Sequence, residues 1–313
     1  MRISILVFAF FLAACSATPT QVTPVTPTAT PAPRIFDGNH AYQEYVLAQM
    51  KLGNRPAGSA ADHATGDYIL AQLKLSNWKT ETQEFSYRNV PIRNVIGKIA
   101  EGRGSIIILG AHYDTRPRAD QDKLHPDQPV PGADDGASGV AVLLELARTL
   151  DVSKLKNEVW LAFFDAEDNG DLKGCQVAPL PCDDTVWPFS VGTTYLADHL
   201  PTKPAAVIVV DMVGDAEQDI YYEYNSDKDY QQQIWAQAAQ LGYTSEFIPQ
   251  YKWSMEDDHT PFLEHGIRAV DIIDFDYLYW HTIEDTADKV VGTSLERVGR
   301  TLQAWLESGP QVK

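Results

Sequence analysis

Short apolar runs alternate with segments of helical periodicity along most of the chain. Continuous apolar segments of strand length occur at 105–110, 158–164 and 205–210, and acidic or histidine side chains follow each of them. Strands that are apolar on both faces are normally covered by helices on both sides. The pattern therefore predicts an α/β fold: a single domain with one mostly parallel, twisted mixed β-sheet flanked by helices on both faces.

The remaining segments of the predicted sheet and its covering helices follow from the same pattern. Ser59 is a good N-cap for the helix expected at 60–75, whereas the spacing of apolar residues at 40–52 is only roughly helical. From Asn169 to Val191 there is no periodicity, and we expect an insertion over the site. Helices are expected at 40–52, 60–75, 140–150, 227–241 and 294–305, and further strands at 79–87, 93–100 and 219–224, with Pro91 between the first two of these strands.

The first 35 residues differ in composition from the rest. The chain begins with one Arg and an apolar run of signal-peptide length, which is too short to span a bilayer as a helix. The residues before Cys15 resemble a bacterial lipobox, in which the Cys is acylated after cleavage; an ordinary cleaved signal peptide is the alternative. Residues 16–35 are mostly Thr, Pro, Ala, Val and Gln, which predicts an extended tether. We expect an exported protein, lipid-anchored to the bacterial cell membrane, with its folded domain (36–313) outside the cytoplasm.

The net charge limits the class of binding partner, and the three cysteines have separate expected roles. The formal net charge of -18 argues against nucleic acid, because phosphate binding needs a basic surface. The chain has three Cys, and Cys15 is assigned to the lipid. Cys175 and Cys182 are close enough in sequence for a loop disulfide in an oxidising compartment. A zinc site is the alternative for this pair, but no nearby Cys or His completes one.

Three of the apolar runs are followed by side chains that bind metals. These are His112, the pair Glu167 and Asp168, and Asp211, while Asp135 lies at the start of a predicted helix. In a largely parallel sheet such strand ends lie on one side. Each acid alone has a simpler explanation, as a solvated loop residue or a helix cap, but their shared position favours a common site. Histidine and carboxylate ligands without Cys suit zinc at a catalytic centre that keeps a position open for water or substrate.

Two short motifs in this set have a chemical interpretation of their own. His112 and Asp114 are two residues apart, so their side chains point the same way in an extended backbone, and Asp114 could hold the imidazole ring. Within the Glu167–Asp168 pair, one carboxylate would bind metal while the other transfers protons in a water-poor cleft. The spacing alone leaves open which carboxylate has which role.

Six motifs occur in a fixed order between about Leu52 and Leu306: GAHYDT, PGADDGASG, FFDAED, VVDMVG, EDDHTPFL and YWHT. In this order they resemble the zinc exopeptidases of the aminopeptidase type, peptidase family twenty-eight, and more narrowly their glutaminyl-peptide cyclotransferase branch. The resemblance implies a zinc exopeptidase-like α/β fold, zinc as the cofactor, and peptide or protein N-termini as substrates.

The resemblance also implies roles for individual residues. Asp135, Asp168 and His281 match the zinc ligands of the cyclases, and Glu167 matches their general acid/base. Asp168 stands where many relatives carry Glu, which shortens the reach of this ligand by one methylene group.

A second metal and a substrate pocket are implied in the same way. In the two-zinc aminopeptidases Asp135 bridges the metals, and His112 and Asp211 join as ligands of the second ion. One zinc, or two, is therefore expected. Asp257 and Trp280 match residues that line the cyclase substrate pocket.

Three functions remain open at this level. As a cyclase, the enzyme would form N-terminal pyroglutamate, with Glu167 passing a proton from the attacking α-amine to departing ammonia. As an aminopeptidase, it would use Glu167 to deprotonate the water that attacks the first peptide bond. The EDDH motif, and Trp280 directly before His281, favour the cyclase. The third alternative is a lipoprotein binding module that has lost its chemistry, and the intact Glu167 argues against it.

Overall fold

The computed structural model describes residues 34–174 and 184–313. Cys15 and the expected Cys175–Cys182 disulfide lie outside the described residues, so the lipid anchor and the disulfide stay predictions. Within the described part of the chain, no helix is both long and apolar enough to cross a membrane.

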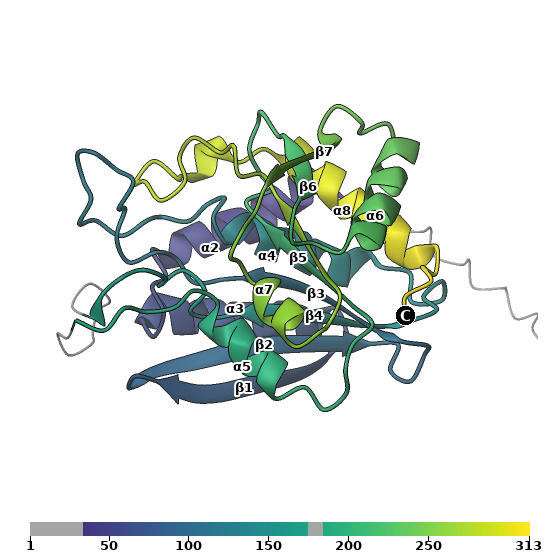
Figure 1. Cartoon of the computed structure of the whole chain (residues 1–313), viewed down its shortest axis with the longest axis horizontal. Helices are drawn as coiled ribbons and strands as arrows, with labels where there is room; N and C mark the ends of the chain where they lie inside the picture. The colour runs from purple at the N-terminus through teal and green to yellow at the C-terminus, as the bar shows by residue number, and fades with distance from the viewer. Residues whose placement is uncertain (1–33, 175–183) are drawn as a thin grey trace, which may run out of the picture. The chain divides into compact units, whose positions relative to one another are not determined.

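Six strands form the main sheet, in the order β1-β2-β4-β3-β5-β8 (Figure 1). The four strands β4, β3, β5 and β8 are parallel, whereas β2 pairs antiparallel with both β1 and β4. The predicted mostly parallel mixed sheet is therefore confirmed. The strands are β1 Lys79–Tyr87, β2 Val90–Ile99, β3 Ile106–His112, β4 Glu158–Phe164, β5 Ala206–Asp211 and β8 Ala269–Ile273.

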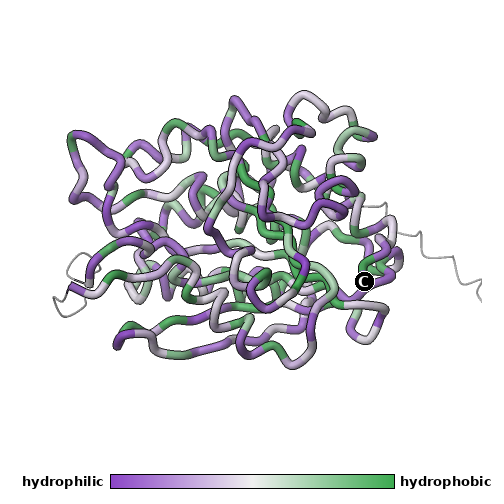
Figure 2. The backbone as a smooth tube through the Cα atoms, in the orientation of Figure 1, coloured by the Kyte–Doolittle hydropathy of each residue, from purple (hydrophilic) through white to green (hydrophobic). Residues whose placement is uncertain are grey.

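Both faces of this sheet are apolar, because alternate residues of a strand point to opposite sides. In β3, Ile107 and Leu109 belong to the larger core cluster, whereas Ile108 between them belongs to a second cluster on the other face. Figure 2 shows apolar segments gathered along the strands in the middle of the fold. Each face therefore needs a cover of helices, as the continuous apolar runs predict.

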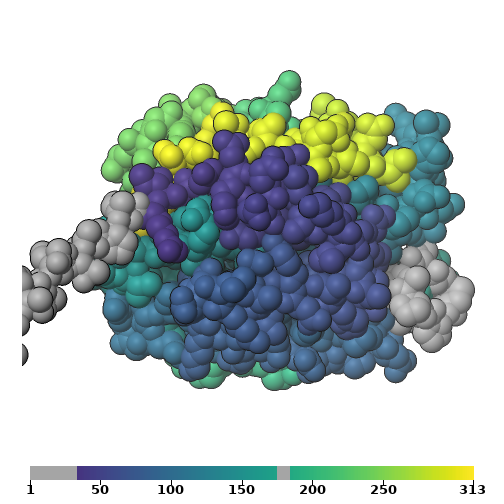
Figure 3. Space-filling model, turned by 180° about the vertical axis from the view of Figure 1, so that it is seen from behind, coloured from purple at the N-terminus to yellow at the C-terminus, as the bar shows by residue number. Residues whose placement is uncertain are grey.

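Helices cover both faces, as expected for this fold class. The larger core cluster lies against α3, α4, α6 and α8, and the second cluster against α5 and α7. From behind, the N-terminal helical segment and α8 lie side by side (Figure 3). The helices are α1 Gly38–His40, α2 Leu47–Leu52, α3 Ala60–Leu75, α4 Ala137–Thr149, α5 Val191–Asp198, α6 Lys228–Gln240, α7 Thr260–Glu264 and α8 Gly292–Glu307, with a 3₁₀ turn at Ala287–Lys289.

The weak periodicity of the first predicted helix has a structural reason. Between α1 and α2, the segment Ala41–Val46 is a π-helix. Its hydrogen bonds join residues five apart, so the apolar positions do not recur at the usual 3.6-residue interval. Tyr45 and Val46 are nevertheless buried against the core.

The expected place of Pro91 between two strands is wrong. The strands β1 and β2 are joined by the two-residue turn Arg88–Asn89, in which both φ angles are positive, as tight hairpins prefer. Pro91 therefore lies inside β2. It is tolerated there because β2 pairs with β4 only from Val95 to Ile99, so the missing N–H of Pro91 is not needed on that side.

A second, two-stranded parallel sheet is formed by β6 Ile220–Glu223 and β7 Phe247–Trp253. The first of these strands is expected from the sequence, and the second is not. Most residues of β7 are exposed, so the strand lacks the apolar pattern that marks the strands of the main sheet.

Candidate metal centre

The carboxyl ends of three parallel strands bring the predicted side chains to one place. His112 is the last residue of β3 and Asp211 is the last residue of β5, while Glu167 and Asp168 follow β4 closely. Asp135 precedes α4, which starts beside these strand ends. All five side chains are buried.

The first group of potential ligands consists of His112, Asp135 and Asp211. The Nε2 atom of His112 lies 3.1 Å from Oδ1 of Asp135 and 3.1 Å from Oδ1 of Asp211. The sequence predicts these residues as ligands of a second metal, and the structure brings them together.

The second group consists of Asp135, Asp168 and His281. The Nε2 atom of His281 lies 3.2 Å from Oδ1 of Asp168 and 3.8 Å from Oδ2 of Asp135. Although the side chain of Asp168 is one methylene group shorter than that of Glu, it still reaches His281. Asp135 belongs to both groups, with one carboxylate oxygen toward each histidine, which is the position of a bridging ligand.

These residues fit a divalent metal. The buried Oδ2 atom of Asp168 has no hydrogen-bond partner, and such an unpaired carboxylate oxygen is costly unless a cation or proton satisfies it. Imidazole nitrogens and carboxylate oxygens, without sulfur, are ligands that zinc accepts. Asp135, Asp168 and His281 would hold one ion, and His112 and Asp211 would complete a second site with Asp135.

Two buried carboxylates position the backbone that carries these ligands. Asp114 accepts hydrogen bonds from the N–H groups of Glu167 (3.0 Å) and Asp168 (3.2 Å). Asp285 accepts from the N–H groups of Asp134 (2.9 Å) and Asp135 (3.2 Å). Each carboxylate therefore fixes two successive residues of a ligand loop.

The expected contact between Asp114 and the ring of His112 is only partly realised. Oδ1 of Asp114 lies 3.6 Å from Nδ1 of His112, which is too long for a hydrogen bond. Instead, the two carboxylate oxygens of Asp114 accept hydrogen bonds from the backbone N–H groups of Glu167 and Asp168. Asp285 was not predicted from the sequence, because the backbone groups that it fixes, at Asp134 and Asp135, are distant along the chain.

A carboxylate from the loop after β3 lies beside the outer ring nitrogen of His281. Oδ1 of Asp120 lies 3.2 Å from Nδ1 of His281, and Asp120 is itself held by the guanidinium of Arg116 at 2.8 and 2.9 Å. A carboxylate on the outer nitrogen fixes the ring of a metal-binding histidine. Arg116 also donates to the carbonyl oxygen of Asp168 at 3.1 Å. Asp120 was not predicted from the sequence, because the Asp- and Pro-rich loop that carries it has no regular pattern.

Unusual backbone conformations accompany the ligands. Ala166, Met212 and His281 have φ angles of 58°, 43° and 55°, in the left-handed region that residues with a side chain rarely adopt. Ala166 directly precedes Glu167, and Met212 directly follows Asp211. Such conformations cost free energy and cluster at functional sites.

Glu167 lies in a cavity of about 250 Å³ beside both ligand groups. Burial raises the pKa of Glu167 well above its ordinary value; His112 opposes this effect, and the neighbouring Asp168 adds to it. A carboxyl group with a raised pKa can accept and return a proton near neutral pH. Trp280 and Asp257 line the same cavity, and the indole of Trp280 stacks on the ring of His281 at 3.9 Å between centroids.

Asp257 belongs to a third group of titratable side chains, with His259 and Asp271. His259 is bracketed by carboxylates, with Nε2 3.4 Å from Glu223 and Nδ1 3.8 Å from Asp271. Burial raises the pKa of Asp271 well above its ordinary value, and the adjacent Asp257 adds to this. Of these three residues, only Asp257 was predicted to have a role.

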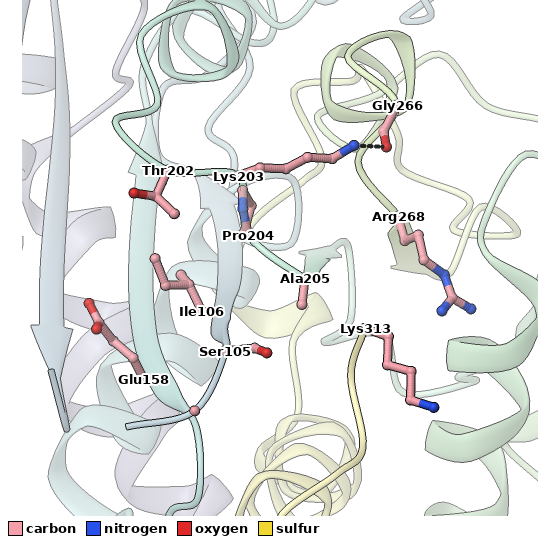
Figure 4. A pocket seen from close by; sticks show the side chains of 11 residues that line it. Ser105, Ile106, Glu158, Thr202, Lys203, Pro204, Ala205, Gly266, Arg268 and Lys313 are labelled. Atoms are coloured by element: carbon pink, nitrogen blue, oxygen red, sulfur yellow. Dashed lines mark hydrogen bonds between the residues drawn. The ribbon is translucent and has the colours of Figure 1, made fainter. Parts of the chain in front are cut away.

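A different cavity, of about 580 Å³, lies near the amino-terminal ends of β3, β5 and β8 (Figure 4). Two of its cations already have partners: Lys203 donates to the carbonyl oxygen of Gly266 at 2.5 Å, and Arg268 pairs with Asp227 at 2.6 Å. None of the three groups of potential metal ligands in the described residues lies there. The chemistry is therefore placed at the carboxyl edge of the sheet.

Strand ends bring His112 and Asp211 to one buried edge of the sheet, where Asp135 before α4 and His281 after β8 join them. This arrangement is typical of a metal-dependent enzyme of the α/β class. The family follows from residues 94–306, which match the model of Peptidase family M28. The chain belongs to Peptidase family M28, and the predicted family resemblance is confirmed.

Solved structures similar to the chain include a cyclase and an aminopeptidase. The glutaminyl cyclase of Bacteroides thetaiotaomicron bound to N-acetylhistamine has a TM-score of 0.80 and 28% identity, covering 89% of this chain and all of that chain. A leucine aminopeptidase precursor from the same organism has a TM-score of 0.79 and 29% identity, covering 88% and 98% of the two chains. Aminopeptidase YwaD of Bacillus subtilis is 26% identical over 238 residues, which are 70% of this chain but only 45% of that protein.

Zinc is expected to stabilise the protein more at neutral than at acidic pH. In the metal-free protein, burial raises the pKa of Asp211 to about 7, against the opposing effect of His112. Burial alone would lower the pKa of His281, but Asp168 and Asp120 raise it to about 9. Both groups must lose a proton to bind metal, so protons compete with zinc more strongly as the pH falls.

The metal-free protein has the opposite pH dependence. Both groups bind protons more tightly in the folded than in the unfolded chain, so the metal-free protein loses stability between pH 3.8 and about 7 through Asp211, and between pH 6.5 and about 9 through His281. Thermal unfolding with zinc and with a chelator should give a Tm difference of about 5 to 10 °C at pH 7.5 and clearly less at pH 5.5. An equal difference at both pH values would contradict the ligand assignment.

Proposed function

We propose that the chain is a zinc-dependent enzyme that acts on peptide N-termini, and that it is a glutaminyl-peptide cyclotransferase. The observation that carries the proposal is the cavity itself, in which Glu167, Asp257 and Trp280 stand beside the ligand group of Asp135, Asp168 and His281. The similarity to the Bacteroides glutaminyl cyclase over that protein's whole length supports it.

The side chains of the cavity suit the cyclisation of an N-terminal glutamine. Zinc would supply a Lewis acid that polarises the side-chain amide carbonyl of the substrate. Glu167 takes a proton from the α-amine as its nitrogen bonds to the amide carbon, and returns this proton to the departing nitrogen, which leaves as ammonia. Asp257 accepts a hydrogen bond from the amine, and Trp280 packs against the glutamine side chain.

An aminopeptidase is the second candidate, and one specific observation favours it. His112, Asp135 and Asp211 form a complete second ligand group that shares Asp135 with the first. Two-metal sites are common in aminopeptidases. In that reaction Glu167 would take a proton from the attacking water and pass it to the amine of the departing peptide.

Product analysis separates the two functions. The zinc-loaded protein is incubated with a peptide that begins with Gln and with a matched peptide that begins with Ala. We expect ammonia from the Gln peptide with every peptide bond intact, and no product from the Ala peptide. Release of free amino acids from both peptides would instead establish the aminopeptidase. Metal analysis of the same sample gives an independent reading, since one zinc per chain favours the cyclase and two favour the peptidase.

A further inference from the structure

The cavity has a buried floor and a half-buried aromatic rim. Asp135, Asp168 and Glu167 lie at the floor and are almost completely buried. The aromatic rings that line the same cavity are only half-buried, so they mark its opening toward solvent. They are Phe189, Phe275 and Trp280.

Two further lining residues, Asp171 and Glu256, are exposed carboxylates at this opening. They come from different segments of the chain, because Asp171 follows β4 in sequence and Glu256 follows β7. Neither carboxylate makes a hydrogen bond or an ion pair with any residue of 34–174 or 184–313. Each is thus free to meet a charged group of a bound molecule.

Hydrogen bonds hold the backbone at Asp171 and directly before Glu256. The N–H of Asp171 donates to the carbonyl oxygen of Trp187 at 3.0 Å. In the other segment, the N–H of Met255, directly before Glu256, donates to the buried carboxylate of Glu223 at 3.0 Å. The negative charge at the opening is therefore part of the folded structure.

Charge in the cavity is strongly one-sided. Seven of the 14 lining residues are Asp or Glu, and none is Lys or Arg. Metal ions bound at the floor would offset the carboxylates there, whereas Asp171 and Glu256 remain uncompensated. A cleft lined by charge of one sign concentrates ligands of the opposite sign.

We propose that the enzyme prefers peptides whose second residue is Lys or Arg, an inference that rests on the proposed action on peptide N-termini. The cavity of about 250 Å³ has room for little more than the first residue of a peptide. The second residue consequently lies at the opening, where Asp171 and Glu256 are found. A basic side chain there is attracted by both carboxylates, and an acidic one is repelled.

The preference should be moderate, because exposed ion pairs contribute little individually. We expect kcat/KM to be about 3- to 20-fold higher for a Gln-Lys peptide than for the matched Gln-Glu peptide at low ionic strength. The ratio should fall toward one in 1 M salt, where charges are screened within about 3 Å.

The test uses the full-length, zinc-loaded protein and two sets of measurements. Turnover of Gln-Lys, Gln-Gln and Gln-Glu peptides is followed by both ammonia and free amino acids, so either reaction is detected. Binding of the same peptides is measured by calorimetry with the Glu167→Gln variant, which does not depend on turnover. If the variant bound the Gln-Lys peptide more tightly but the wild-type protein turned over none of the peptides, the proposed function would be refuted and the charge preference would stand.

Paired substitutions separate a local effect from a change in net charge. The double variant Asp171→Asn, Glu256→Gln should bind the three peptides with equal affinity. The control Glu84→Gln, Glu264→Gln removes the same charge from two exposed positions that do not line the cavity, and should keep the wild-type preference. The inference would be overturned if the protein with Asp171 and Glu256 intact bound the Gln-Lys and Gln-Glu peptides with equal affinity. It would also be overturned if both double variants lost the preference to the same extent.

Discussion

Replacing Glu167 by glutamine is expected to lower turnover about 100- to 10,000-fold while the zinc content stays at the wild-type level. The substitution keeps the shape of the side chain and removes its ability to take a proton. The backbone N–H of Glu167 still donates to Asp114, so the loop that carries the ligand Asp168 is retained. Initial rates with a Gln-initiated peptide and metal analysis of the same preparation measure the two effects.

A matched control for this variant is Glu84→Gln, an exposed carboxylate on β1 outside the cavity. It should leave both turnover and zinc content unchanged. If Glu167→Gln also retained wild-type turnover, Glu167 would not be the general acid/base. If it lost its zinc, the residue would instead be part of the ligand set.

Asp135→Asn should abolish activity and remove the response of Tm to zinc. Asp135 belongs to both ligand groups, so its loss weakens both metal sites at once. The asparagine keeps the size of the side chain, and its backbone N–H can still donate to Asp285. Zinc per chain and the Tm difference between zinc and chelator are the measurements.

The neighbouring Asp134 provides the control. It is also buried, but its Oδ1 atom accepts the N–H of Gly214 at 2.6 Å, and it belongs to none of the potential ligand groups. Asp134→Asn should retain zinc and activity. Equal zinc loss in both variants would mean that the loop, and not the ligand, had been disturbed.

The strand ends were predictable because two local patterns coincide there. A buried parallel strand leaves a continuous apolar run in the sequence, and the residue where this run stops is visible directly. His112, the Glu167–Asp168 pair and Asp211 were found in this way, and the family resemblance then assigned the ligand role within the pair to Asp168. The structure brings His112, Asp168 and Asp211 each into a ligand group. The chemical difference between Asp165 and Asp168 was not visible from the run alone: Asp165 accepts the backbone N–H of Arg93 at 2.8 Å and so fixes β2 to the end of β4.

The residues that were missed lack such a pattern, because their partners are distant in sequence. Asp120 and Asp285 act on residues more than a hundred positions away, His281 and Asp134 respectively. Asp271 lies within an apolar strand and meets His259 only through the packing of β8 beside the loop before α7. Such carboxylates become recognisable only when the tertiary structure supplies their neighbours.

The sharing of Asp135 between ligand groups from several strands has a consequence for folding kinetics. The ligands extend along the chain from His112 to His281, and no two lie on the same strand. Contacts of such sequence separation form late, because the loops between them must close first. High-affinity metal capture therefore has to follow assembly of the parallel sheet, and a nascent or partly folded chain offers only scattered acids. Metal uptake during refolding would thus report completion of the native fold.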